Sequence, residues 1–127
     1  MKRSIIFATL VGLTLALGIR PAQARPAIAS GDRLLNTNQS GCLSLADRFI
    51  SSLQVESDRG PIDCTGYFED GSFRILCYEA GQDSLAVIFA THEESGDVAS
   101  NFVRMALTQL GQEGELSQQP PKAKPKP

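Results

Sequence analysis

The sequence predicts an α+β domain in the order α-β-β-β-α, in which a three-stranded antiparallel meander carries two helices on one face. The two helices are predicted from apolar residues that recur at helical spacing, first over 40–54 and again from 95 to about 110. Another pattern predicts the sheet: apolar residues flank an Asp-Gly turn over 62–79, and a further alternating run covers 84–91. Packing both helices on one face of a small sheet is the simplest arrangement of these elements.

The first 24 residues have the features of a secretory signal peptide. Lys2 and Arg3 precede an apolar run from Ile5 to Ile19, and Ala22-Gln23-Ala24 then supplies a small-x-small cleavage site. The run is shorter than the roughly 20 residues that a membrane-spanning helix needs. We therefore expect cleavage after this site and no transmembrane segment in the mature chain. The expected location is the bacterial periplasm, the cell exterior, or an internal lumen reached by the same export route.

Composition divides the remaining 103 residues into three parts. Residues 25–37 show little periodicity, which predicts a flexible lead-in, and residues 38–112 form the predicted single domain. Residues 113–127 are predicted to be a disordered Pro/Lys-rich tail. The mature chain has a net charge of −5, and residues 30–116 alone carry −9. An acidic domain argues against nucleic acid and anionic lipid as its partners.

The first helix is predicted from an apolar stripe. Asn38 or Ser40 is positioned to cap its N-terminus. The stripe has the i, i+3, i+4, i+7 spacing of one helix face. Its members are Cys42, Leu45, Ala46, Phe49, Ile50 and Leu53.

The Asp70-Gly71 dipeptide predicts a two-residue type I′ turn, because both central positions of that turn need a positive φ. In the resulting register Phe68 faces Phe73, Gly66 faces Ile75 and Cys64 faces Cys77. Tyr67 and Arg74 form a pair on the opposite face of the hairpin.

This register also predicts the disulfide. Cys64 and Cys77 occupy a non-hydrogen-bonded pair, whose short Cα separation lies at the close end of the disulfide range. We therefore predict a Cys64–Cys77 bridge, with Cys42 paired to either of them as the alternative. Cys42 is then left on the apolar stripe of the first helix, either as a small buried hydrophobe or as a reactive thiol.

The last strand and helix follow from simpler patterns. Leu85, Val87 and Phe89 alternate with Ala86, Ile88 and Ala90, so each set occupies one face of a strand. Ser95 is a candidate N-cap for the second helix and Gly111 a candidate C-cap. The main apolar stripe between them consists of Ala99, Phe102, Val103, Ala106 and Leu110.

No pattern in the chain assigns a catalytic residue, a metal site or a cofactor. His92 is the only histidine, and the His-Glu-Glu that it begins lacks the second histidine of the zinc-protease pattern. A small hydrolase that uses His92 with Glu93 or Glu94 is a minor alternative. Five carboxylates are expected near the hairpin ends, and we interpret them as a solvated acidic surface. They are Asp63, Glu69, Asp70, Glu79 and Asp83.

These observations favour a non-enzymatic interaction or accessory module whose partner is a protein or an envelope component. Tyr67 and Arg74 mark the candidate contact surface, because Tyr and Arg are enriched at binding hot spots. The alternative is a thiol-dependent role for Cys42, as a redox sensor or as the link of a covalent dimer of an otherwise monomeric chain. The tail lysines are either a solubilising end or an arm that touches an anionic partner or the acidic domain; they are Lys122, Lys124 and Lys126.

Overall fold

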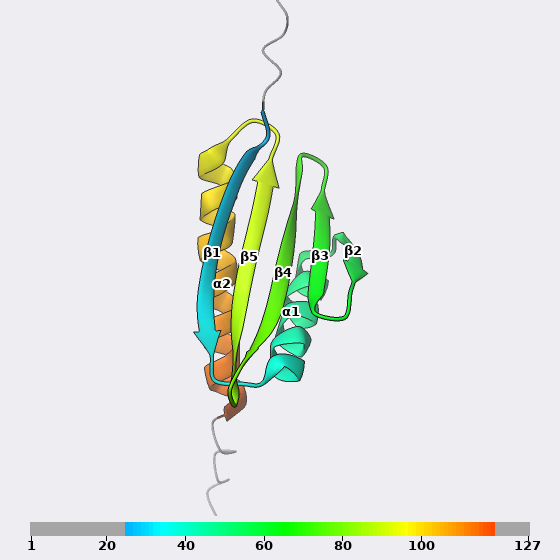
Figure 1. Ribbon diagram of the computed structural model, residues 1–127. Coiled ribbons are helices and arrows are strands. Elements are labelled where there is room, and N and C mark those ends of the chain that lie inside the picture. Colours follow the sequence, from blue (N-terminus) through cyan, green and yellow to red (C-terminus); the bar gives the residue numbers. More distant parts are fainter. Residues whose placement is uncertain (1–24, 119–127) are drawn as a thin grey trace, which may run out of the picture.

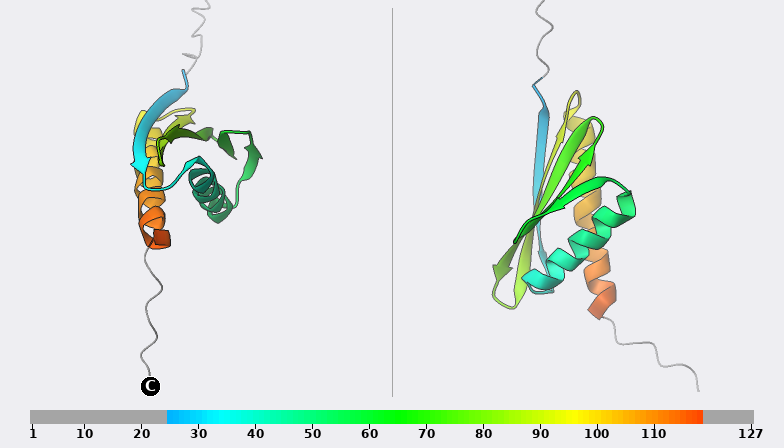
Figure 2. Two further views of the ribbon diagram at one scale, coloured as in Figure 1. Left: turned by 60° about the horizontal axis from the view of Figure 1, so that its bottom comes forward. Right: turned by 90° about the vertical axis from the view of Figure 1, so that its right-hand side faces the viewer.

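The computed structural model describes residues 25–118, with side chains to residue 115. A five-stranded antiparallel sheet in the order β1-β5-β4-β3-β2 carries two helices on one face (Figure 1; side-on in Figure 2). The α+β class and the two helices on one face agree with the expectation. The sheet has five strands instead of three, and the order is β-α-β-β-β-β-α instead of α-β-β-β-α, because one additional strand precedes the first helix and another follows it. The elements in chain order are β1 (Ala27–Leu35), α1 (Gln39–Leu53), β2 (Glu56–Arg59), β3 (Asp63–Phe68), β4 (Gly71–Ala80), β5 (Asp83–His92) and α2 (Gly96–Gln118).

The two additional strands lie at the two edges of the sheet. β1 occupies most of the segment that was expected to be a flexible lead-in, and it pairs with β5 along its whole length. Its helix-facing positions are mostly small, including Ala27, Ala29 and Gly31, because α2 packs closely over them. β2 is a four-residue strand whose residues are all exposed. Neither strand therefore has the apolar alternation that identifies a half-buried strand in sequence.

Both helices begin where the sequence predicts. The Asn38 side chain accepts a hydrogen bond from the Gly41 N–H at 2.9 Å, and Ser95 Oγ accepts one from the Val98 N–H at 3.2 Å. α2 does not end at Gly111 but continues to Gln118, so it includes part of the predicted tail. Gly111 instead permits a close approach, because a Cβ there would lie 2.1 Å from Cζ of Arg33.

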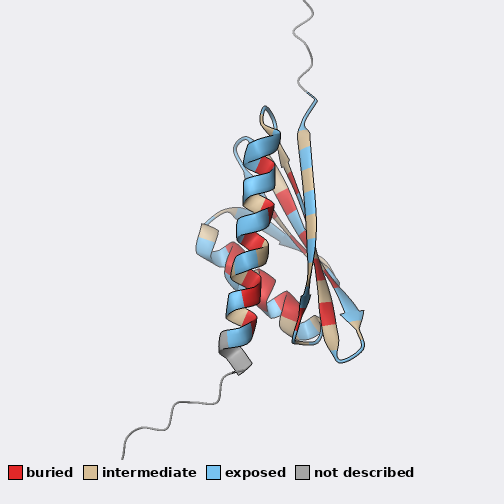
Figure 3. Cartoon of the chain, turned by 90° about the vertical axis from the view of Figure 1, so that its left-hand side faces the viewer, coloured by how far each residue is buried: buried red, intermediate tan, exposed pale blue. Residues whose placement is uncertain are grey.

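The core fills the space between the sheet and the helices, and its residues lie on the facing sides of both layers (Figure 3). α1 packs on β3 and β4, while α2 packs on β1 and β5. Phe73 is at the centre of an aromatic group, with its ring centroid 4.6 Å from that of Phe102 and 6.1 Å from that of Phe49. The largest fully buried apolar side chains are Phe49, Phe73, Ile75, Ile88 and Leu110.

The β3–β4 hairpin has a different register from the predicted one. Its loop is Glu69-Asp70, Phe68 pairs with Gly71, and Cys64 pairs with Ile75. The only glycine with positive φ in the described residues is Gly81, so Gly71 is not placed for a primed turn. Gly71 lies against β5 instead, where a Cβ would be 2.1 Å from the Thr91 carbonyl oxygen. The observed register differs from the predicted one by two residues. Because side chains alternate between the two faces of a strand, a shift of two leaves every residue on its predicted face.

Candidate functional site

The face of the sheet opposite the helices has no layer packed on it in the described part of the chain, as Figure 2 shows. Six apolar side chains gather there on neighbouring strands, and we name them the open-face patch. In cross-strand pairs, Leu85 lies between Leu34 and Tyr78. Leu34, Tyr78 and Phe89 are 57%, 43% and 45% exposed. The members of the patch are Leu34, Leu76, Tyr78, Leu85, Val87 and Phe89.

Tyr67 and Arg74, the predicted contact residues, lie on this same face beside the patch. The observed register places Arg74 between Thr65 and Phe89 and makes Tyr67 its diagonal neighbour, rather than its direct partner. The two side chains border a shallow hollow of about 360 Å³ together with Phe89 and Thr91. Polar and apolar groups therefore adjoin on the open face, as they do at protein interfaces.

Acidic neighbours fix both contact residues in place. The Tyr67 hydroxyl donates to Asp58 Oδ2 at 2.9 Å, and this hydrogen bond raises the pKa of the phenol above its usual value. Nε of Arg74 lies 3.1 Å from Asp63 Oδ2 and donates to Thr65 Oγ1 at 3.2 Å. These exposed pairs contribute little to stability but reduce the number of rotamers that a partner must immobilise.

A second hollow, of about 210 Å³, lies where β3, β4 and β5 meet the first turns of α2. We name it the end pocket. Its apolar lining comes from Phe68 on β3, Ala90 on β5 and three residues of α2, namely Val98, Ala99 and Phe102. Asp70 and His92 also line it.

His92 connects the two loops beside the end pocket. Its Nε2 lies 2.9 Å from Asp70 Oδ2, and its Nδ1 accepts hydrogen bonds from the backbone N–H groups of Glu94 and Ser95 at 3.2 and 2.9 Å. An accepting Nδ1 places the ring proton on Nε2, which then donates to Asp70. Both ring nitrogens are thus engaged in holding the loops together. The carboxylate that contacts the imidazole is Asp70, rather than Glu93 or Glu94 as the hydrolase alternative supposes.

The disulfide joins Cys42 of α1 to Cys77 of β4, with a Cα–Cα distance of 5.9 Å, so the predicted Cys64–Cys77 bridge is wrong. In the observed register the Cys77 N–H donates to the Ile62 carbonyl, two residues before Cys64. Residues related by such a diagonal lie about 7–8 Å apart, beyond comfortable disulfide reach. Cys42 therefore has no free thiol for the redox or dimerisation role.

The free cysteine is Cys64, which is buried. Its thiol donates to Asp47 Oδ1 at 3.2 Å, and Asp47 also forms an ion pair with Arg59. Burial, followed by the hydrogen bond to Asp47, raises the pKa of the Cys64 thiol to about 12. Since the thiolate is the nucleophile, this cysteine is chemically inert near neutral pH.

We expect Cys64 to react with iodoacetamide at pH 8 at least ~100-fold more slowly in the folded protein than in denaturant, because the thiol is both buried and protonated. Intact-mass analysis over time measures the rate. The unreduced, denatured chain should take up one label, since the other two cysteines form the disulfide. Equal rates with and without denaturant would contradict the buried position.

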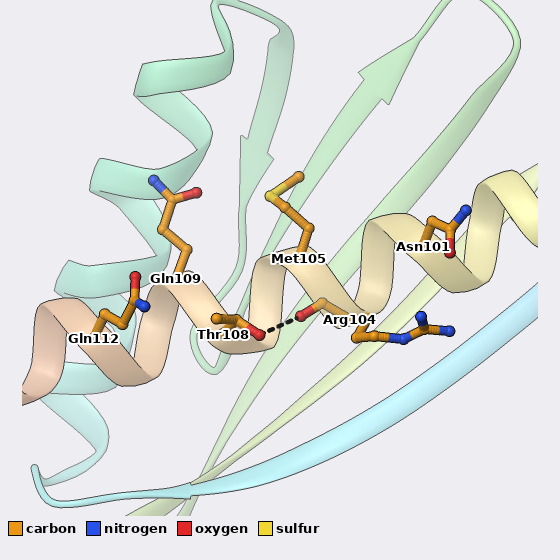
Figure 4. Close-up of a pocket in the computed structure, with 6 residues that line it drawn as sticks. All are labelled: Asn101, Arg104, Met105, Thr108, Gln109 and Gln112. Carbon is orange, nitrogen blue, oxygen red and sulfur yellow. Dashed lines mark hydrogen bonds between the residues drawn. The ribbon is translucent and has the colours of Figure 1, made fainter.

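A third hollow lies along the outer face of α2 and has a volume of about 470 Å³. Figure 4 shows that its lining side chains all come from this one helix and spread along it instead of converging. The single hydrogen bond drawn among them runs from the Thr108 hydroxyl to the Arg104 carbonyl, within the helix. This face has the character of an ordinary solvated helix surface.

The other predicted residues are not brought together. Glu69 and Asp70 lie in the β3–β4 loop, whereas Glu79 and Asp83 lie at the opposite end of the sheet, next to the β4–β5 loop. Asp63 pairs with Arg74. The described residues contain no group of His, Cys, Asp and Glu placed to hold a metal ion. The predicted signal peptide (residues 1–24) and Lys122, Lys124 and Lys126 lie outside the described residues.

Comparisons of the chain with models of protein families, with curated proteins and with solved structures found no match. Among residues 25–118, no helix is long and apolar enough to cross a membrane.

Proposed function

We propose that this protein is an exported, non-enzymatic interaction module that binds a partner protein through the open face of its sheet. The observation that carries the proposal is the open-face patch, in which six apolar side chains from β1, β4 and β5 adjoin Tyr67 and Arg74. An apolar centre beside Tyr and Arg is the composition of a binding hot spot. The leader sequence and the disulfide support export, because disulfides persist in oxidising compartments.

The charges around the patch indicate the chemistry of the partner. Three exposed acidic residues, Asp32, Glu56 and Asp58, lie on the same face, and Arg74 is balanced by Asp63. The partner surface should therefore have an apolar centre and a rim that is neutral or basic. His92 is engaged in loop packing and Cys64 is protonated, which favours a binding role over a catalytic one.

Site-specific photo-crosslinking in the native envelope tests this proposal. With p-benzoylphenylalanine at Phe89, we expect a discrete adduct with one partner. The matched probe at Asn101, an exposed residue on α2, should give none. Adding Tyr67→Ala and Arg74→Ala should reduce the Phe89 adduct at least tenfold, since each hot-spot truncation weakens binding by about 2 kcal/mol or more and about 1.4 kcal/mol is a factor of ten.

Thermal unfolding followed by circular dichroism is the control, and the double variant should melt like the parent because both side chains are exposed. Adducts of equal yield from positions 89 and 101, or a yield that is insensitive to the double variant, would exclude the open face as the binding surface.

A further inference from the structure

The end pocket has a shape suited to a single large side chain. Phe68, Ala90, Ala99 and Phe102 line it, and Val98, which is 50% exposed, borders its mouth. The Phe68 and Phe102 rings meet edge to face with centroids 5.4 Å apart, so the lining is aromatic and well packed. Its volume of about 210 Å³ is below the roughly 300–1,000 Å³ of pockets for drug-sized ligands. It is large enough for a group of the size of benzene, which fills cavities of about 150 Å³.

The rim of this pocket is strongly acidic. It is formed by the β3–β4 loop and by the connection from β5 to α2, which lie at the same end of the molecule (Figure 1). The two segments are joined by the hydrogen bond from the Glu93 N–H to the Asp70 carbonyl at 2.9 Å. Asp70 lines the pocket itself. Three more exposed carboxylates belong to these two segments, namely Glu69, Glu93 and Glu94, and Asp97 follows in the first turn of α2.

Few cationic groups offset these carboxylates. The chain has no Lys or Arg between Arg74 and Arg104. Arg25, with the α-amino group that the predicted cleavage would leave on it, is two residues from Ala27, which pairs with His92, and it balances only part of this negative charge. The N-terminus of α2 adds only about half a positive charge, and its first turn is already capped by Ser95 and contains Asp97. The field at the mouth of the pocket therefore favours cations.

We propose that the end pocket binds one large apolar side chain, such as Phe or Leu, that is flanked by Lys or Arg in a segment of a partner protein. The apolar side chain fills the pocket, and its basic neighbours lie against the acidic rim. This site is separate from the open face, since its apolar lining comes from the helix-facing side of the sheet and from α2. It is therefore a second binding surface, which adjoins the open face where Ser72 and Thr91 line both hollows.

Three matched peptides test the proposal on the isotope-labelled mature domain by the chemical shifts of its backbone amides. Acetyl-Lys-Phe-Lys-amide should bind with a Kd on the order of 1 mM and shift the amides of Ala90, Val98, Ala99 and Phe102. Acetyl-Glu-Phe-Glu-amide should bind about tenfold more weakly, because the carboxylates of the rim repel its negative charges. Acetyl-Lys-Ala-Lys-amide should also bind about tenfold more weakly, because it has no large apolar side chain to fill the pocket. Raising the salt from low to high concentration should weaken the binding of both Lys-flanked peptides, but not that of the Glu-flanked peptide.

Charge-neutral variants test the rim without altering the fold. Glu93→Gln with Glu94→Gln should weaken Lys-Phe-Lys binding several-fold, whereas the matched pair Glu79→Gln with Asp83→Asn, at the other end of the sheet, should not. Equal affinity for the Lys- and Glu-flanked peptides, or shifts that map away from the pocket, would overturn the proposal. Equal binding of a peptide comprising residues 118–127 would also overturn it, because that segment has lysines but no large aliphatic or aromatic side chain.

Discussion

Replacing Cys42 and Cys77 together by alanine is expected to lower the free energy of unfolding by roughly 4 kcal/mol. The disulfide spans 35 positions and ties α1 to a central strand of the sheet, so its removal frees a large part of the unfolded chain. Because a small domain is stabilised by only about 5–15 kcal/mol, the double variant should unfold at a much lower urea concentration. Equilibrium urea unfolding without reductant measures the difference.

Cys64→Ala is the matched control, because it removes a buried cysteine that forms no bridge. It loses the hydrogen bond to Asp47 and one sulfur atom, and we expect a cost of about 1 kcal/mol. The unreduced variant should still be lighter than its reduced form by the two thiol hydrogens. A destabilisation as large as that of the double variant, with no such mass difference, would instead place Cys64 in the bridge.

The elements with apolar periodicity could be predicted from the sequence, and the two edge strands could not. The stripe of α1 and the alternation in β5 reflect one buried face each, and this is the signal that a sequence displays. β1 faces α2 with small residues, and its outward Ile28 and Leu34 are the more exposed ones. In an ordinary edge strand the large apolar residues face the core, whereas in β1 Ile28 and Leu34 face outward. The sequence pattern therefore does not identify β1 as a strand, and its position follows only from its packing against α2.

The predicted disulfide is wrong because Gly71 does not form the turn that its Asp-Gly dipeptide indicates. Asp-Gly is a strong signal for a primed turn, but Gly71 is used for its close approach to Thr91, and the turn falls one residue earlier. That shift keeps the faces correct and moves the cross-strand partner by two residues, which is enough to change which cysteines meet. Tyr67 and Arg74 were placed on the correct face by the same logic, since alternation does not depend on register.

The end pocket had no signature in the sequence. Its residues come from three strands and a helix that are separated along the chain, and their apolar character is indistinguishable from that of the core. The sequence shows that Glu69 precedes Asp70 and that Glu93 and Glu94 follow His92. Only the topology shows that these acidic residues meet at one end of the sheet.

Replacing Phe73 by alanine is expected to lower the free energy of unfolding by about 3–5 kcal/mol. The side chain is 2% exposed, and its ring contacts those of Phe49, Phe68 and Phe102. The strand opposite cannot fill the resulting cavity, because its partner position is Gly66, over which the Phe73 ring lies. Urea unfolding with the disulfide intact measures the loss.

Phe89→Ala is the matched control on the neighbouring strand, since the same atoms are removed from a side chain that is 45% exposed on the opposite face of the sheet. Its expected cost is about 1 kcal/mol, because nearly half of the side chain is already in contact with water. If the open face is the binding surface, this variant should nevertheless weaken partner binding. An equal loss of stability in both variants would mean that Phe89 is covered as part of the core, and the open-face patch would then have no free surface with which to bind.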